Sequence, residues 1–156
     1  TSKDEIVTGF DNIIQNIKNN LPTAAIDGVL VQKMVEPGLE VILGITNKDG
    51  FGPILMVGFG GTSVEASGDV AFALCPVTNK KCENLLGTLK GSTLLDEKRY
   101  DIPALFRLMT TLSSFAISVQ HLISEIDLNP VILHSPGNGI SVVDALMVKS
   151  DKTSKR

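Results

Sequence analysis

Two turn signals that separate apolar runs constrain the fold of this chain more than any other feature. The first, Asn47-Lys48-Asp49-Gly50, and the second, Ser135-Pro136-Gly137-Asn138-Gly139, contain the Asn and Gly residues that hairpin turns require. The apolar runs beside these turns are residues 39–46, 54–59, 126–133 and 141–148. A short turn joins neighbouring strands that run in opposite directions. The sequence therefore predicts an antiparallel sheet.

Helical patterns stand before and between these runs. Ser2 and Glu5 form a capping-box pattern, and the apolar residues that follow at helical spacing predict a helix over 3–20. The other expected elements are helices over 79–89 and 102–122, strands over 28–34 and 69–75, and a polar loop over 91–100. Paired strands with helices between them predict an α+β domain, in which a largely antiparallel sheet packs against helices.

The bulk composition excludes several classes of function. The 156 residues fit one domain, which we expect over 1–149 with a polar tail over 150–156. A net charge of −3 argues against a nucleic-acid partner, and no apolar run is long enough to span a membrane. Two cysteines make no disulfide framework, which favours reduced thiols and a cytoplasmic location. Because the chain begins at Thr1 without Met, we expect an excised piece.

Oxygen-bearing side chains alternate with apolar ones near the C-terminus. Strand geometry places Glu125, Asp127 and Asn129 on one face, and Asp144 follows on the next expected strand. Oxygen ligands from two neighbouring strands suit Mg²⁺ that also holds nucleotide phosphates. An ordinary solvated sheet face explains the same spacing, so both interpretations stay open.

A glycine-rich segment from Gly58 to Glu65 follows one of the expected strands. The pair Gly60-Gly61 allows close approach of a ligand, but the spacing matches neither a P-loop nor a dinucleotide fingerprint. A plain turn is the alternative. His121 and His134 have no catalytic neighbours in sequence, and Glu40 by itself indicates no function.

Several of these motifs, in the same order, resemble the ATP-grasp part of ADP-forming (NDP-forming) acyl-CoA synthetases. The matching segments are Gly28–Met34, Gly38–Gly44, Phe51–Pro53, Gly58–Gly61 with Glu65, Asp69–Pro76, Glu125–Pro130 and Val143–Ala145. The resemblance extends from the first helix to about Met147 and implies the C-terminal lobe of the ATP-grasp module, with the first lobe absent.

The resemblance also implies roles for individual residues. It assigns nucleotide binding to the hinge at Lys33, Met34 and Val35. It assigns the ribose hydroxyls to Glu40, and further nucleotide binding to Gly60, Gly61 and Glu65. It assigns metal binding to Asp127, Asn129 and Asp144, and catalytic roles to Lys90 and Glu125. Lys90 stands where the family usually has Arg. Lysine keeps the positive charge but cannot form a bidentate fork with a phosphate.

The function implied is the nucleotide-binding half of an enzyme that interconverts acyl-CoA, ADP and phosphate with a carboxylic acid, CoA and ATP. The implied cofactors are ATP or ADP and Mg²⁺. The implied partners are CoA-binding or ligase subunits or domains in an oligomeric parent enzyme, without which the isolated chain is expected to be inactive. Two alternatives are a regulatory module of a protein lysine acetyltransferase and a binding or assembly domain without catalysis.

Overall fold

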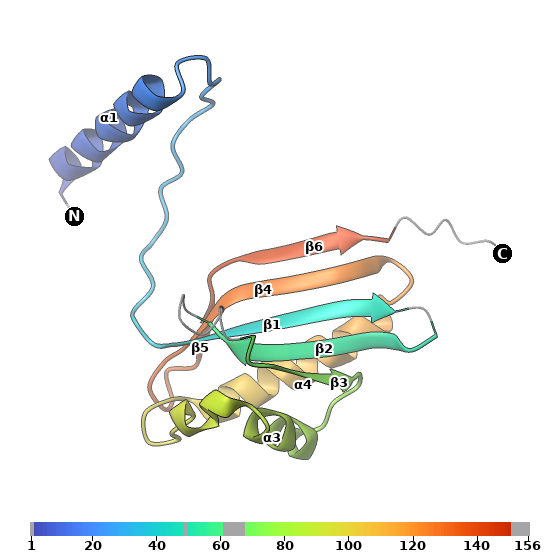
Figure 1. Ribbon diagram of the computed structural model, residues 1–156. Coiled ribbons are helices and arrows are strands. Elements are labelled where there is room, and N and C mark those ends of the chain that lie inside the picture. Colours follow the sequence, from blue (N-terminus) through green and yellow to red (C-terminus); the bar gives the residue numbers. More distant parts are fainter. Residues whose placement is uncertain (1, 49, 61–67, 151–156) are drawn as a thin grey trace. The chain divides into compact units, whose positions relative to one another are not determined.

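The computed structural model describes residues 2–48, 50–60 and 68–150. Contacts within the chain divide it into two compact units, Thr1–Met34 and Val35–Arg156. Each unit is described by itself, and Figure 1 shows the elements of both. The assignment of 1–149 to one lobe stays a prediction, and the predicted tail lies outside the described residues from position 151 onward.

The first unit consists of helix α1 (Lys3–Asn20) and a segment without regular structure. The predicted capping box is confirmed, since Ser2 Oγ accepts from Glu5 N at 3.2 Å and Glu5 Oε2 accepts from Ser2 N at 2.7 Å. The predicted strand over 28–34 is wrong: these residues are extended but unpaired, and Leu30 is 80% exposed. A strand needs a backbone partner, and no described strand pairs with this run.

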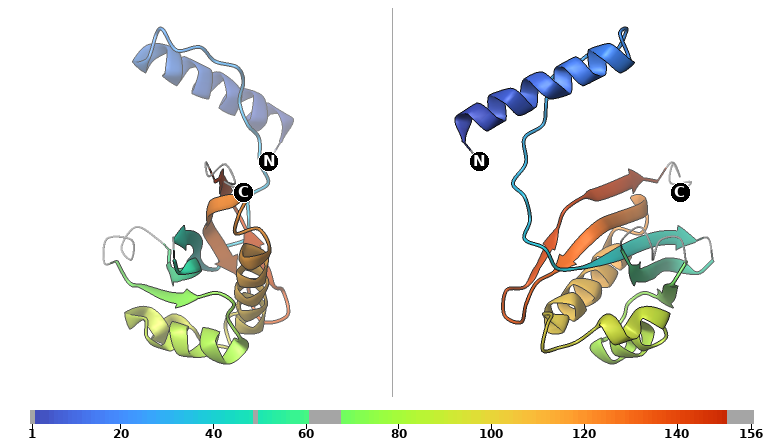
Figure 2. Two further views of the ribbon diagram at one scale, coloured as in Figure 1. Left: turned by 90° about the vertical axis from the view of Figure 1, so that its right-hand side faces the viewer. Right: turned by 60° about the vertical axis from the view of Figure 1, so that its left-hand side comes forward.

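The second unit is built on a six-stranded antiparallel sheet (Figures 1 and 2). Its strands are β1 (Leu39–Lys48), β2 (Gly52–Phe59), β3 (Val70–Leu74), β4 (Ile123–Leu133), β5 (Ile140–Val142) and β6 (Ala145–Lys149). The order is β3-β2-β1-β4-β5, and β6 also pairs with β4. Both predicted hairpins are confirmed, because β1 pairs with β2 and β4 pairs with β5, each antiparallel.

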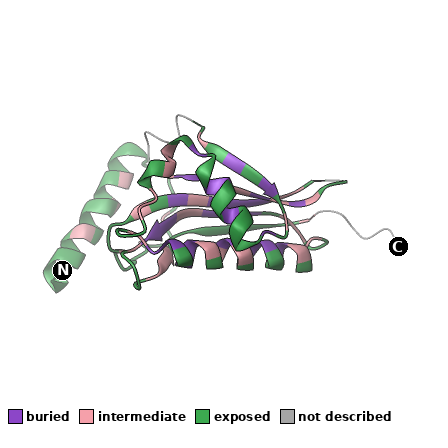
Figure 3. Ribbon diagram, turned by 90° about the horizontal axis from the view of Figure 1, so that it is seen from below, coloured by how far each residue is buried: buried purple, intermediate pink, exposed green. Residues whose placement is uncertain are grey.

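Helices α3 (Asn79–Gly87) and α4 (Ile102–Ser118) cover one face of this sheet, and a short 3-10 helix η1 (Lys90–Leu94) lies between them in sequence. Figure 3 shows buried positions alternating with exposed ones along these elements. On β1, Val41, Leu43 and Ile45 alternate into the core, which is the pattern expected for a sheet covered on one side. Among the described residues, no helix is long and apolar enough to cross a bilayer.

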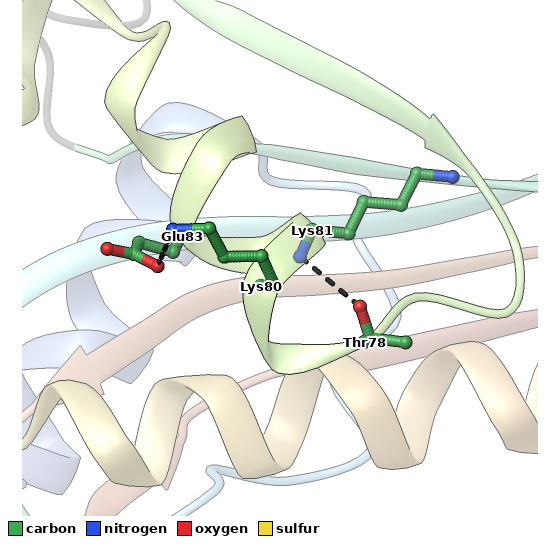
Figure 4. A network of polar contacts seen from close by, with 4 residues as sticks. All are labelled: Thr78, Lys80, Lys81 and Glu83. Carbon is green, nitrogen blue, oxygen red and sulfur yellow. Dashed lines mark hydrogen bonds and ion pairs between the residues drawn. The ribbon is translucent and has the colours of Figure 1, made fainter.

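Helix α3 begins at a capped and ion-paired turn (Figure 4). Thr78 Oγ1 accepts a hydrogen bond from Lys81 N at 3.3 Å, and Lys80 Nζ pairs with Glu83 Oε2 at 2.8 Å. Lys81 Nζ donates to the Leu74 carbonyl at 3.1 Å. The side chain of Lys81 therefore links α3 to the end of β3.

The second face of the sheet is not covered by any described helix of this unit. Its outward positions on β3 are apolar and exposed, namely Val70, Phe72 and Leu74. These residues alternate with Ala71 and Ala73, which are buried against the helices. The fold is thus the predicted α+β arrangement, with one face of the sheet packed and the other open.

The C-terminal part of the sheet differs from the sequence prediction. The single strand expected over 141–148 is two strands, β5 and β6, separated at Val143 and Asp144. Pro130 lies opposite this break and has no N–H to donate, so the regular ladder cannot continue there. The polar loop expected over 91–100 contains η1.

A buried aspartate joins α4 to the loop between β4 and β5. Asp101 Oδ1 accepts from Ala104 N at 3.0 Å, and Asp101 Oδ2 accepts from both Gly137 N and Gly139 N at 3.0 Å. Burial alone raises the pKa of Asp101, but these three hydrogen bonds together with the positive charge of Arg107 outweigh it and leave the pKa below its ordinary value of 3.8. The carboxylate therefore binds a proton less readily in the folded protein than in the unfolded chain.

Replacing Leu105 by Ala tests the core. Leu105 is 0% exposed on α4, and its truncation leaves a cavity beneath the sheet. We expect the free energy of unfolding to fall by about 2–5 kcal/mol in chemical denaturation. The matched control is Leu94→Ala, because Leu94 is 46% exposed, and its effect is expected to be much smaller. Equal losses in both variants would contradict the assignment of the core.

The Asp101 bonds predict a pH dependence of stability. A lowered folded-state pKa stabilises the protein above the unfolded pKa, and the stabilisation is lost as pH falls through the folded value. We expect the free energy of unfolding to decline as pH falls from above the ordinary value of 3.8 through the lower folded pKa of Asp101. Asp101→Asn is expected to flatten this decline, as measured by denaturation at several pH values. Identical pH profiles for the variant and the wild type would contradict the prediction.

Candidate functional site

The acidic residues of β4 lie on the uncovered face of the sheet. Ile126 and Leu128 are buried against the helices, so the alternating Glu125 and Asp127 point the other way. Asp127 is half-buried and lies opposite Gly44 of β1 in the register. Because Gly44 has no side chain, only backbone lies beside Asp127 on that strand. The place that a Gly44 side chain would take is approached by Met56 of β2, whose Cε would stand 3.2 Å from a Cβ on Gly44.

Asn129 and Asp144 are brought together at the break between β5 and β6. Asn129 N donates to the Asp144 carbonyl at 3.2 Å, directly beyond the pairing of Leu128 with Ala145. Residues opposite each other in antiparallel strands place their side chains on the same face. Asp127 is two residues before Asn129 and shares that face. The backbones of Asn129 and Asp144 are thus adjacent, Asp144 Oδ1 accepts from Ala145 N at 2.8 Å, and the grouping of the three side chains stays a prediction.

The donor set of this patch is two carboxylates and one amide oxygen. Among the described residues, no three His, Cys, Asp or Glu side chains gather closely enough to hold a metal ion by themselves. Mg²⁺ is usually held by one or two carboxylates together with substrate phosphates and water. The oxygen donors of Asp127, Asn129 and Asp144 therefore fit Mg²⁺ that arrives with a nucleotide, rather than an ion bound by protein ligands alone.

Glu40 lies against Gly60 at the far end of the β1–β2 pair. Gly60 N donates to the Glu40 carbonyl at 2.8 Å, and a Cβ on Gly60 would stand 2.9 Å from Glu40 Cβ and 3.4 Å from Glu40 Oε2. A side chain at position 60 would therefore displace Glu40. Two other predicted residues of this region, Gly61 and Glu65, lie outside the described residues.

The predicted hinge falls at the boundary between the two units. Lys33 and Met34 belong to the first unit and Val35 to the second, and none of the three lies in a helix or strand. Lys33 and Met34 are exposed, and Val35 is half-buried. Their role in adenine binding stays a prediction.

The structure adds a residue that the sequence analysis did not single out. Asp69 Oδ1 accepts from Lys90 N at 2.9 Å, and Asp69 Oδ2 accepts from Gly91 N at 2.8 Å. The bond from Gly91, followed by that from Lys90, holds the pKa of Asp69 below its ordinary value of 3.8, although partial burial opposes the shift. The positively charged Lys90 lowers the pKa further. The only signal for Asp69 in the sequence was its position directly after Gly68, and a Gly-Asp pair is common in turns.

The cysteine and histidine side chains show no nucleophilic arrangement. Burial raises the pKa of both the Cys75 and Cys82 thiols, so neither favours the thiolate, and neither forms a disulfide. His134 Nε2 lies 2.8 Å from Ser141 Oγ across the β4–β5 pair, which is a structural contact. Both observations agree with a site based on oxygen ligands.

Comparison with known proteins establishes the family. The family model of the ATP-grasp domain matches residues 1–148. The chain is an ATP-grasp domain. Its relatives place it among the domains of ADP-forming acetyl-CoA synthetases, as the sequence motifs predicted.

Two curated relatives show how much of a ligase the chain represents. The 4-hydroxybutyrate–CoA ligase (ADP-forming) of Nitrosopumilus maritimus is 36% identical over 148 residues, covering 92% of the chain and 21% of the relative. The beta subunit of acetate–CoA ligase (ADP-forming) II of Pyrococcus furiosus is 34% identical over 151 residues, covering 94% of the chain and 64% of the subunit. The ATP-grasp domain thus spans less than two thirds of either relative.

A solved structure confirms the fold. One chain of the "dinucleotide forming Acetyl-coenzyme A synthetase 1" of Ca. Korarchaeum cryptofilum matches with a TM-score of 0.79 at 35% identity, over 96% of this chain and 66% of the matched chain. That structure is a complex with coenzyme A, Ca-AMPCP and HgCl+. Another crystal structure of the same protein holds coenzyme A and Mg-AMPPCP, and matches with a TM-score of 0.76 at 32% identity.

The close packing of Gly91 generates a prediction. A Cβ on Gly91 would stand 2.7 Å from the ring of Phe59, which is itself 3% exposed and has no room to move. We expect Gly91→Ala to lower the free energy of unfolding by about 1–3 kcal/mol. Gly87→Ala is the matched control, since a Cβ on Gly87 meets nothing within 4 Å. A denaturation experiment in which both variants match the wild type would contradict the packing.

Proposed function

We propose that this ATP-grasp domain supplies the adenine-nucleotide and magnesium site of an ADP-forming acyl-CoA synthetase. The reaction would interconvert acyl-CoA, ADP and phosphate with a carboxylic acid, CoA and ATP. The observation that supports the proposal is the backbone bond from Asn129 N to the Asp144 carbonyl, next to Asp127 on the uncovered face of β4. The Mg-AMPPCP complex of the Korarchaeum relative supports a nucleotide site in this family.

The proposed roles follow from the chemistry of each side chain. Asp127 and Asp144 provide anionic oxygens, and the Asn129 amide provides a neutral one, which together suit a hard divalent cation. Bound Mg²⁺ would neutralise the charge that develops on phosphate oxygens during phosphoryl transfer. Glu125 begins the same strand face and is proposed to support these ligands.

Glu40 and Lys90 are proposed to contact the remaining parts of the nucleotide. The carboxylate of Glu40 can accept hydrogen bonds from the two ribose hydroxyls, and its position is set by Gly60. Lys90 is exposed at the start of η1 and carries a positive charge that can contact a phosphate as a point charge. Lys33, Met34 and Val35 are proposed to bind the adenine edge through their backbone groups, with Gly61 and Glu65 near the phosphates.

The partner is proposed to be the CoA-binding part of the same enzyme. One relative is the beta subunit of an acetate–CoA ligase, and the other matched relative is a longer single chain. Both are ligases, which favours a synthetase over a regulatory acetyltransferase module or an inactive assembly domain. The isolated domain is proposed to be inactive without the rest of the nucleotide site.

Substitution of the metal ligands tests the proposal in the complete enzyme that contains this domain. We expect Asn129→Ala and Asp144→Ala to abolish turnover that depends on nucleotide, because both remove oxygen donors for Mg²⁺. The assay measures ATP formation from acetyl-CoA, ADP and phosphate over a range of Mg²⁺ concentrations, and circular dichroism checks that the fold survives.

The control variant is Asp96→Asn, which removes a carboxylate that accepts only a local bond from Lys98 N at 2.9 Å. This variant is expected to keep wild-type turnover. Wild-type turnover in either Asn129→Ala or Asp144→Ala, at any Mg²⁺ concentration, would overturn the metal assignment.

A further inference from the structure

Asp69 uses both carboxylate oxygens to hold the backbone that carries Lys90. The two bonds, from Lys90 N at 2.9 Å and from Gly91 N at 2.8 Å, connect the start of β3 to the first residues of η1. A two-oxygen contact with two successive N–H groups fixes both the position and the direction of the chain at Lys90. The pKa of Asp69 is lowered by these bonds, so the contact is made by the charged carboxylate.

The backbone of Asp69 is itself held by a close approach to β2. A Cβ on Gly58 would stand 3.0 Å from the Asp69 carbonyl oxygen and 2.9 Å from Val70 Cγ1. Gly58 also lies opposite Val70 in the register of β2 and β3. The absence of a side chain at position 58 therefore lets Asp69 lie directly against the end of β2.

The same end of β2 holds Glu40 from its other side. Phe59 follows Gly58, and its buried ring lies against Gly91. Gly60 follows Phe59 and lies against the side chain of Glu40. Residues 58–60 thus contact Asp69, Gly91 and Glu40 through three close approaches, and each approach has a glycine on one side, at position 58, 91 or 60.

We propose that Asp69 is a positioning residue for the nucleotide site, which fixes Lys90 relative to Glu40 through the residues 58–60 and through Gly91. This inference rests on the proposed function, in which Glu40 contacts the ribose and Lys90 contacts a phosphate. The ribose and the phosphates are parts of one molecule with limited internal freedom. The two contacts therefore assist each other only when their separation is set by the protein.

The alternative is that Asp69 only stabilises the start of η1. The two roles differ in one measurable way. Lys90→Ala removes the side chain but keeps the backbone N–H to which Asp69 bonds. The stability that the two backbone bonds provide is therefore lost with Lys or Ala at position 90, whereas a loss of Lys90 placement matters only while the lysine side chain is present.

The experiment is a double-mutant cycle in the complete enzyme. We expect Lys90→Ala and Asp69→Ala each to lower kcat/KM for ADP by about 10- to 100-fold. In the Lys90→Ala background, Asp69→Ala is expected to lower kcat/KM by less than about twofold. Asp69→Asn is the second variant, for use if Asp69→Ala impairs folding. It keeps the size of the side chain and one acceptor oxygen, so its expected loss of kcat/KM is smaller than that of Asp69→Ala.

Asp96→Asn again serves as the control, because Asp96 lies beyond the end of η1 and its Oδ1 accepts from Lys98 N. It is expected to leave kcat/KM unchanged. Equal losses from Asp69→Ala in both backgrounds, or no loss in either, would overturn the positioning role. Wild-type activity of Lys90→Ala would overturn this inference and the role of Lys90, while the Asn129 and Asp144 variants still decide the proposed metal site separately.

Discussion

The pairing of β1 with β4 is the interaction on which the rest of the second unit depends. β1 lies between β2 and β4 in the sheet, and its inward residues Val41, Leu43 and Ile45 are 4% exposed or less. The same ladder sets Gly44 opposite Asp127 on the outward face. Because strand side chains alternate with period two, a slip of one residue would expose the core and bury the acidic residues together. The packing of the core and the outward position of Asp127 are therefore specified by one set of backbone hydrogen bonds.

Glycine allows three close approaches around the end of β2. Gly58, Gly60 and Gly91 each allow a contact that any Cβ would prevent. The result is a dense region around Phe59, from which Glu40 and Lys90 project as charged side chains. A substitution at any of these glycines would displace neighbouring atoms, although none of the three offers a side chain for chemistry.

Much of the fold could be predicted from local pattern. The turn signals beside β1, β2 and β4 identified the hairpins, and the capping pattern of Ser2 and Glu5 identified the start of α1. The alternation from Glu125 to Asn129 placed the acidic residues on one face, because period two depends only on neighbouring residues. These features need no knowledge of distant parts of the chain.

The features that escaped prediction all involve distant partners. The apolar run over 28–34 has the composition of a strand, but a strand forms only where another backbone is available, and composition does not report that. The break at Val143 and Asp144 depends on Pro130 across the ladder. The Asp69 bonds span 21 and 22 residues, and an isolated aspartate gives no signal of so remote an acceptor role.

The three bonds of Asp101 have a practical consequence for engineering this domain. Surface hairpin loops are usually the best places to insert a tag or a fluorescent label, because few contacts hold them. The loop between β4 and β5 is different, since Gly137 and Gly139 both have positive φ and both donate to Asp101 Oδ2. An added residue there would separate these two N–H groups and release the loop from α4. Fusions are better placed elsewhere, even though Pro136 and Asn138 look as exposed as any insertion site.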